Sequence, residues 1–194
     1  WRPSDAFGNL ILASTTTLPI LNFSPPSIAS PTVANDGTGT ILATYLATVG
    51  GTYRLSVSLP GTSVDGTGWN VTIGANVFDS SSSTATGLGV SLDTAGILAT
   101  FTVVARDRYS NLITKGFTFT TLVKTADGDF RASCLSTTYF CNYMVTRSGS
   151  LTVSVLKGAN HVRGSPFPVK VNPSYVDTDK SATLATSLAT AGQD

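Results

Sequence analysis

The stretch that decides the fold is GANHVRGSPFPVKV, residues 158–171. It follows the alternating run LTVSV at residues 151–155 and ends in a second alternating run, FPVKV, at residues 167–171. Alternation of apolar and polar residues is typical of strands that bury one face. The segments KGAN and GSP between the two runs carry residues that favour turns. The stretch therefore predicts a strand–turn–strand unit.

The sequence also repeats itself at a nearly constant offset. DAFGNL at residues 5–10 returns as DRYSNL at residues 107–112, and GGTYRLSV at residues 50–57 corresponds to SGSLTV at residues 148–153. A shorter match, TAG, occurs at residues 94–96 and again at 190–192. Because these matches keep the same order at offsets close to 98 residues, they indicate tandem structural repeats.

These motifs resemble the filamin-type immunoglobulin-like repeat. ARDRYSN at residues 105–111 and GSPF at residues 164–167 match motifs of that family. The first copy keeps DGT at 36–38 and GTY at 51–53, but has GTGW at 66–69 in place of GSPF. The resemblance implies an all-β fold of tandem immunoglobulin-like β-sandwich repeats, a class that serves adhesion, scaffolding and binding and is rarely catalytic.

The offset between the copies predicts the domain organisation. Residues 1–75 are expected to be a partial repeat that lacks its opening strands, residues 77–172 a complete repeat, and residues 173–194 a linker and the opening strand of a following repeat. The chain is thus interpreted as a window of a longer array. The vacant edge of the first repeat would be filled by upstream residues or by the tail of a neighbouring molecule, and the second arrangement would propagate into a fibre.

The composition narrows the choice of compartment and partner. Charged residues are 12% of the chain, about half the share usual in a soluble domain. The net charge is +1 without a basic cluster, so nothing indicates nucleic acid or an anionic membrane as partner. No apolar run approaches the roughly 20 residues of a spanning helix. With so few charges, solubility must come from hydroxyl groups, since 53 residues are Ser or Thr, or from glycans, and this favours an extracellular or cell-surface location.

The two cysteines point to the same location. Cys134 and Cys141 flank a short polar segment between two expected strands, a spacing that suits a disulfide across a hairpin. The alternative is a pair of unconnected buried thiols. Zinc needs four ligands and His161 is the only histidine, which disfavours a metal site. A disulfide would imply an oxidising compartment.

Asn70 begins the sequon NVT and is the candidate glycosylation site. It is expected to face outward on a strand whose Trp69, Val71 and Ile73 face inward. An ordinary exposed polar residue is the alternative. The four serines at 80–83 are interpreted as a flexible polar linker, with attachment of O-linked sugars as the alternative.

No catalytic constellation is recognisable. One histidine and no Gly-x-Ser-x-Gly motif disfavour a hydrolase, and the glycine-rich segments lack the strand-to-helix setting that binds phosphate. Two aspartate pairs, Asp127 with Asp129 and Asp177 with Asp179, are too sparse for calcium, which takes six or more oxygen ligands. We therefore predict no enzymatic activity, no cofactor and no metal.

The function predicted from these patterns is that of a non-catalytic extracellular structural or adhesion module. It would be part of a longer tandem-repeat cell-surface or fibre-forming protein, with other proteins or identical chains as partners and possible covalent glycans. The alternative is an intracellular filamin-like scaffold that binds peptides by strand addition to a sheet edge. A proline-rich segment at residues 18–31 is expected to be an edge strand that continues as an extended connection.

Overall fold

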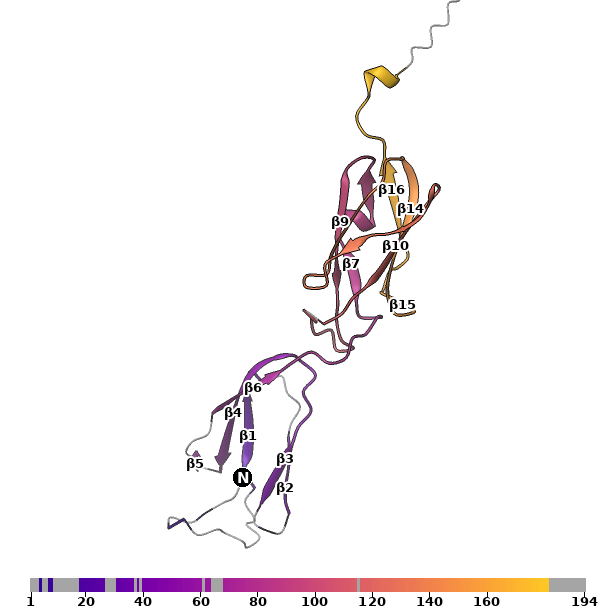
Figure 1. Cartoon of the computed structure of the whole chain (residues 1–194). Helices are drawn as coiled ribbons and strands as arrows, with labels where there is room; N and C mark the ends of the chain where they lie inside the picture. Colours follow the sequence, from indigo (N-terminus) through magenta and orange to yellow (C-terminus); the bar gives the residue numbers. More distant parts are fainter. Residues whose placement is uncertain are drawn as a thin grey trace, which may run out of the picture.

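The computed structural model describes residues 4, 7–8, 18–26, 31–36, 38, 40–60, 62–63, 68–114 and 116–181. Its strands form two groups, which lie end to end in Figure 1. We call strands β1–β6 the first repeat and strands β7–β16 the second repeat. The motif at residues 5–10, apart from residues 7 and 8, and the whole of residues 182–194 lie outside the described residues.

The first repeat contains a four-stranded and a two-stranded sheet. They are built from β1 (Ile20–Ser24), β4 (Gly51–Leu59), β5 (Thr62–Ser63) and β6 (Trp69–Ile73), and from β2 (Thr32–Asn35) and β3 (Ile41–Thr44). Strand β1 pairs only with β4 among the described strands, so the proline-rich segment begins as the expected edge strand. Among the described residues of this repeat, the buried hydrophobic side chains are Ile41, Tyr53 and Val57.

The second repeat is a sandwich of a six-stranded and a four-stranded sheet. The larger sheet has the order β11 (Gly128–Arg131), β10 (Thr120–Thr125), β14 (Gly149–Lys157), β16 (Phe167–Asn172) and β8 (Leu92–Thr94), with β15 (Asn160–His161) paired to β14. The smaller sheet has the order β12 (Ser133–Cys134), β13 (Phe140–Met144), β9 (Leu98–Val104) and β7 (Thr84–Thr86). Two short 3-10 helices, η1 (Leu88–Val90) and η2 (Thr178–Lys180), complete the described elements.

The core of the second repeat lies between these sheets. Val153 and Val169 project from the larger sheet and Phe101 and Cys141 from the smaller one, and each is at most 2% exposed. Burying a valine or phenylalanine side chain stabilises a fold by about 1.5–3 kcal/mol. The alternating pattern of residues 151–155 and 167–171 thus reflects one face turned into this core. The all-β sandwich fold predicted from the sequence is confirmed.

The two repeats share their strand register. Strand β4 pairs with β6 from Gly51↔Ile73 to Leu55↔Trp69, and β14 pairs with β16 from Gly149↔Val171 to Val153↔Phe167. Every pair in the second repeat stands 98 residues after its counterpart in the first. The internal repetition of the sequence is therefore also a repetition of the hydrogen-bonded structure.

The serine run at residues 80–83 is an ordered turn, so its interpretation as a flexible linker is wrong. The Asp79 carboxylate accepts hydrogen bonds from Ser81 Oγ (2.5 Å) and from the Ser82 N–H (2.8 Å). Ser83 is fully buried, and its hydroxyl donates to the Asp79 carbonyl at 2.7 Å. Polar residues of a linker and of a capped turn are the same types, which is why composition did not distinguish them.

Candidate functional site

His161 and the glycine-rich segment around Gly89 have structural roles. The Nδ1 atom of His161 lies 2.8 Å from Ser165 Oγ, which also accepts the N–H of Val155 at 2.8 Å, so the histidine fastens a turn. A Cβ atom added to Gly89 would lie 2.9 Å from the Thr100 carbonyl oxygen, which shows that this glycine allows close packing on β9. These contacts explain the presence of the histidine and of the glycine without a bound ligand.

Asp127 and Asp129, weighed as calcium ligands, form ion pairs with exposed side chains. Asp127 Oδ1 lies 2.5 Å from Arg147 Nη1, and Asp129 Oδ2 lies 3.9 Å from Lys124 Nζ. Within the described part of the chain, no three His, Cys, Asp or Glu residues are placed to hold a metal. No described helix has the length and apolar character needed to cross a membrane.

A dense network of hydrogen bonds lies at the turn at residues 107–111, where the second repeat meets the first. Asp107 is fully buried. Its Oδ1 accepts the N–H groups of Tyr109 and Asn111, both at 2.9 Å, and its Oδ2 accepts Asn111 Nδ2 and the Asn76 N–H, both at 2.8 Å. One buried carboxylate thus organises the turn and holds the segment that enters the second repeat.

Asn111 joins the two repeats directly. Its Nδ2 donates to the Thr48 carbonyl at 2.9 Å, and its Oδ1 accepts the Gly50 N–H at 2.7 Å. Thr48 and Gly50 belong to the loop that leads from β3 to β4 in the first repeat. Because the amide uses both its donor and its acceptor on one loop, it fixes the orientation of that loop as well as its distance.

Two further properties describe this turn. Burial opposes ionisation of Asp107, but the hydrogen bonds from Asn111, Asn76 and Tyr109 outweigh it and lower the pKa of the carboxyl below its usual value. Ser110 has a φ of 69°, in the left-handed region, and Gly8 has a φ of 85° at the matching place of the DAFGN motif. The turn therefore requires a conformation that glycine adopts at lower cost.

Sequence reasoning found this motif but not its role. The recurrence of Asp-x-x-x-Asn at residues 5–9 and 107–111 was visible as part of the repeat. The bonds from Asn111 to Thr48 and Gly50 span 63 and 61 residues of sequence, and no local pattern shows which loop lies opposite.

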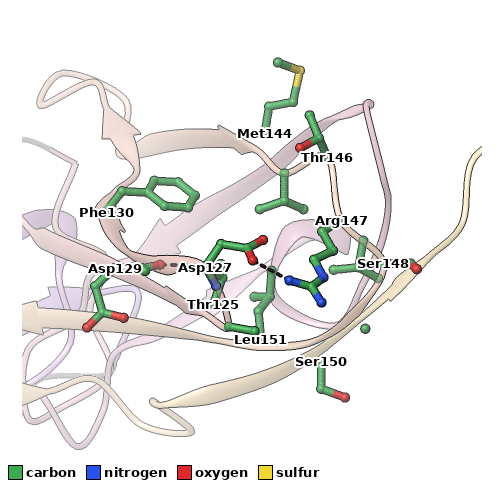
Figure 2. Close-up of a pocket in the computed structure, with 15 residues that line it drawn as sticks. Thr125, Asp127, Asp129, Phe130, Met144, Thr146, Arg147, Ser148, Ser150 and Leu151 are labelled. Atoms are coloured by element: carbon green, nitrogen blue, oxygen red, sulfur yellow. Dashed lines mark hydrogen bonds and ion pairs between the residues drawn. The ribbon is translucent and has the colours of Figure 1, made fainter.

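A hollow of about 500 Å³ opens at the other end of the second repeat. It lies between the β10–β11 turn and the loop at residues 145–148, which leads from β13 to β14. Figure 2 shows the Asp127 carboxylate facing the Arg147 guanidinium across this hollow. Arg147 and Asp127 are both more than half exposed in their side chains, so their ion pair contributes little to stability.

Cys134 and Cys141 form a disulfide, with their Cα atoms 4.1 Å apart. The two residues are direct partners in the ladder between β12 and β13. Cys141 is fully buried in the sandwich core. The structure therefore contains the hairpin bridge that the spacing of the cysteines predicts, rather than two separate thiols.

The strand that carries Asn70 differs in part from the expectation. Asn70 and Thr72 are exposed, while Val71 and Ile73 are half-buried, so these residues alternate as predicted. Trp69, expected to face inward, is 51% exposed. The indole lies near the end of its sheet, where β4 is its only described strand neighbour, and it is not enclosed as a core residue would be.

Comparison with known proteins agrees with this architecture. Residues 77–168 match the family model of the Filamin/ABP280 repeat, and this segment is distantly similar to filamin-type repeats. The chain is also similar to InvD of Yersinia pseudotuberculosis, with 21% identity and a TM-score of 0.57 over 94% of this chain and 54% of that structure. Invasin, a bacterial integrin-binding protein, gives 14% identity and a TM-score of 0.56 over 88% of this chain and 35% of that structure.

These likenesses define the fold class as immunoglobulin-like β-sandwich repeats. The chain spans about half of the InvD structure and about a third of the invasin structure. No curated protein matches the sequence.

Proposed function

We propose that this chain is a non-catalytic spacer segment of an extracellular tandem-repeat protein, which holds an adhesive or fibre-forming surface at a fixed distance. The observation that carries the proposal is the junction at Asn111, which bonds to the Thr48 carbonyl and the Gly50 N–H of the preceding repeat. Repeats that are joined only by a linker reorient freely, whereas a hydrogen-bonded junction transmits position from one repeat to the next.

In this proposal residues 1–75 are a partial repeat, residues 77–172 a complete repeat, and residues 173–194 a linker with the opening of a following repeat. The shared register of β4–β6 and β14–β16 supports the division. A second support is the turn that opens at Asp177, which repeats the turn that opens at Asp79. Ser181 Oγ donates to the Asp177 carbonyl at 2.6 Å, as Ser83 Oγ donates to that of Asp79.

The extracellular location is supported by the disulfide between Cys134 and Cys141, since such bonds persist in oxidising compartments. Glycosylation of the exposed Asn70 belongs to the same proposal. Peptide capture by strand addition receives less support from the edge of the larger sheet. There β11 is four residues long and carries Asp129 and Arg131, and short charged edges resist the pairing of another strand.

The test is thiol alkylation of the protein from its native source, with thiols trapped before lysis. We expect Cys134 and Cys141 to be unreactive until a reductant is added, and Asn70 to carry a glycan in peptide mass spectra. Free thiols together with an unmodified Asn70 would overturn the extracellular proposal and favour the intracellular scaffold.

A further inference from the structure

We propose that the loop at residues 145–148 is a docking site for a following repeat of the same polypeptide, the repeat that opens at Asp177. The Asp-x-x-x-Asn turn of that repeat would bind this loop as Asn111 binds the loop of the first repeat. The inference rests on the tandem array proposed above and names the surface through which the array continues.

The loop corresponds to an interface that is already formed. Thr146 and Ser148 stand 98 residues after Thr48 and Gly50, the two residues that Asn111 contacts. Thr48 and Gly50 are half-buried, whereas Thr146 and Ser148 are exposed. The same backbone positions are therefore covered in one repeat and open in the other.

The exposed loop at residues 145–148 has a hydrogen-bond acceptor and a donor available. Among the described residues, no hydrogen bond reaches the Thr146 carbonyl and none leaves the Ser148 N–H. The matching groups of the first repeat, the Thr48 carbonyl and the Gly50 N–H, are those that Asn111 uses. A primary amide is the ligand chemistry that satisfies an acceptor and a donor spaced in this way.

The two loops differ at one of the two positions that Asn111 contacts, and this difference leaves room for an asparagine side chain. Ser148 stands where the first repeat has Gly50. A Cβ atom added to Gly50 would lie 3.5 Å from Asn111 Oδ1 and 3.5 Å from the Ile73 carbonyl oxygen, which is ordinary van der Waals contact. A serine therefore fits beneath a docked asparagine without moving the backbone.

The occupant follows from the segment that leaves the second repeat. At the formed junction, five residues separate Ile73, the end of β6, from Asp79, which opens the next turn. Five residues also separate Val171, the counterpart of Ile73, from Asp177, and the turn at Asp177 repeats the hydrogen bond of the turn at Asp79. A repeat that opens at Asp177 would thus start in the same relation to this loop.

The experiment compares the 194-residue chain with an extended chain in which residues 79–194 follow Val176. The appended copy carries Met144→Leu, so that its peptides differ in mass from those of the original copy. Hydrogen exchange is measured by mass spectrometry on peptides that cover residues 145–149 of the original copy. The matched control is the extended chain with Asn111→Ala in the appended copy only.

We expect hydrogen exchange at residues 145–149 to be slower by about 5- to 10-fold in the extended chain than in the 194-residue chain, as one or two added hydrogen bonds require. In the control, the exchange rate should return to that of the 194-residue chain. Asn111→Ala in the 194-residue chain serves as the reference and should speed exchange around Gly50 by a similar factor.

If the reference variant responds but the appended repeat leaves residues 145–149 unchanged, the docking site is wrong while the first junction and the array stand. Protection that appears in the 194-residue chain and grows with its concentration would mean that a second copy occupies the loop, and would also overturn the proposal. The alkylation test of location is independent of every one of these outcomes.

Discussion

At the scale of single residues, the turn at 107–111 combines a strained backbone position, Ser110, with a carboxylate, Asp107, that accepts several hydrogen bonds. Asp107 is buried and accepts four hydrogen bonds, and Ser110 adopts a left-handed backbone conformation. Such departures from ordinary geometry persist where the surroundings over-determine them. Here they aim the Asn111 side chain at the neighbouring repeat.

Ser110→Gly should stabilise the second repeat. The left-handed conformation costs a non-glycine residue about 1–2 kcal/mol, and part of this gain is lost because glycine is more flexible in the unfolded chain. We expect a net gain of about 0.5–1 kcal/mol in the free energy of unfolding, measured by chemical denaturation. Ser110→Ala, which retains the strain, is the control and should change little. An equal gain in both variants would contradict the backbone explanation.

Asp93 is a second unusual residue, with consequences for pH dependence. It is 7% exposed, its Oδ1 accepts the Thr94 N–H at 2.7 Å, and its buried Oδ2 has no hydrogen-bond partner among the described residues. Burial raises the pKa of this carboxyl above its usual value, so the folded state favours the protonated form. The stabilisation that comes from protonated Asp93 is therefore fully present below the pKa of this carboxyl in the unfolded chain. It is lost as the pH rises through the higher pKa of the folded protein.

Asp93→Asn should remove this dependence. We expect the unfolding free energy of the variant, relative to the native protein, to increase as the pH is raised from about 4 to 7, because only the native protein must bury a charge. Denaturant titrations at several pH values give the comparison. A difference between the two proteins that stays constant across this range would show that Asp93 does not titrate in it.

At the scale of elements, the strands were predictable and the way they are tied together was less so. Alternation at residues 151–155 and 167–171 predicted β14 and β16, because a half-buried strand requires that pattern. The partner loops at the junction were not predictable, since the contact of Asn111 with Gly50 depends on how two folded repeats meet. The linker interpretation of the serine run at 80–83 was wrong for a related reason. The burial of Ser83 depends on backbone groups distant in sequence, such as the Arg106 N–H.

The hairpin of β12 and β13 is the element that carries the disulfide. The bridge between Cys134 and Cys141 closes a sequence separation of seven residues, for which the loop-entropy relation gives about 2.5 kcal/mol. We expect Cys134→Ala combined with Cys141→Ala to lower the unfolding free energy of the second repeat by about 2–3 kcal/mol. Denaturation of the native protein with and without reductant provides the comparison. A loss confined to the double variant would assign the effect to the missing side chains rather than to the bridge.

At the scale of the whole molecule, the relative position of the repeats depends on few bonds. Three hydrogen bonds among the described residues hold it: Asn111 with Thr48, Asn111 with Gly50, and Asp107 with the Asn76 N–H. Because all three involve the turn at 107–111, a change at one carboxylate should loosen the junction while both sandwiches stay folded.

Acid should therefore open the junction. The pKa of Asp107 lies below its usual value of 3.8, so the stabilisation from its ionised form is complete above about that pH and is lost as the pH falls through the lowered pKa. Protonation weakens the acceptor of four hydrogen bonds and frees the turn that orients Asn111. Spin labels placed on the exposed residues Leu42 and Leu112 would report this as a distance distribution that is narrow at pH 5 and broadens once the pH falls through the lowered pKa of Asp107.

Asp107→Asn gives the same test at neutral pH, where neither sandwich is exposed to acid. An asparagine replaces one acceptor oxygen by a donor. In either orientation its amide nitrogen then faces two donors, the Asn76 N–H and Asn111 Nδ2 or the N–H groups of Tyr109 and Asn111, so it cannot restore the native network. We expect the variant to show the broad distance distribution at pH 7, little further change on acidification, and a near-native core by near-ultraviolet circular dichroism. A narrow distribution in this variant would mean that packing, rather than the Asp107 network, holds the two repeats in line.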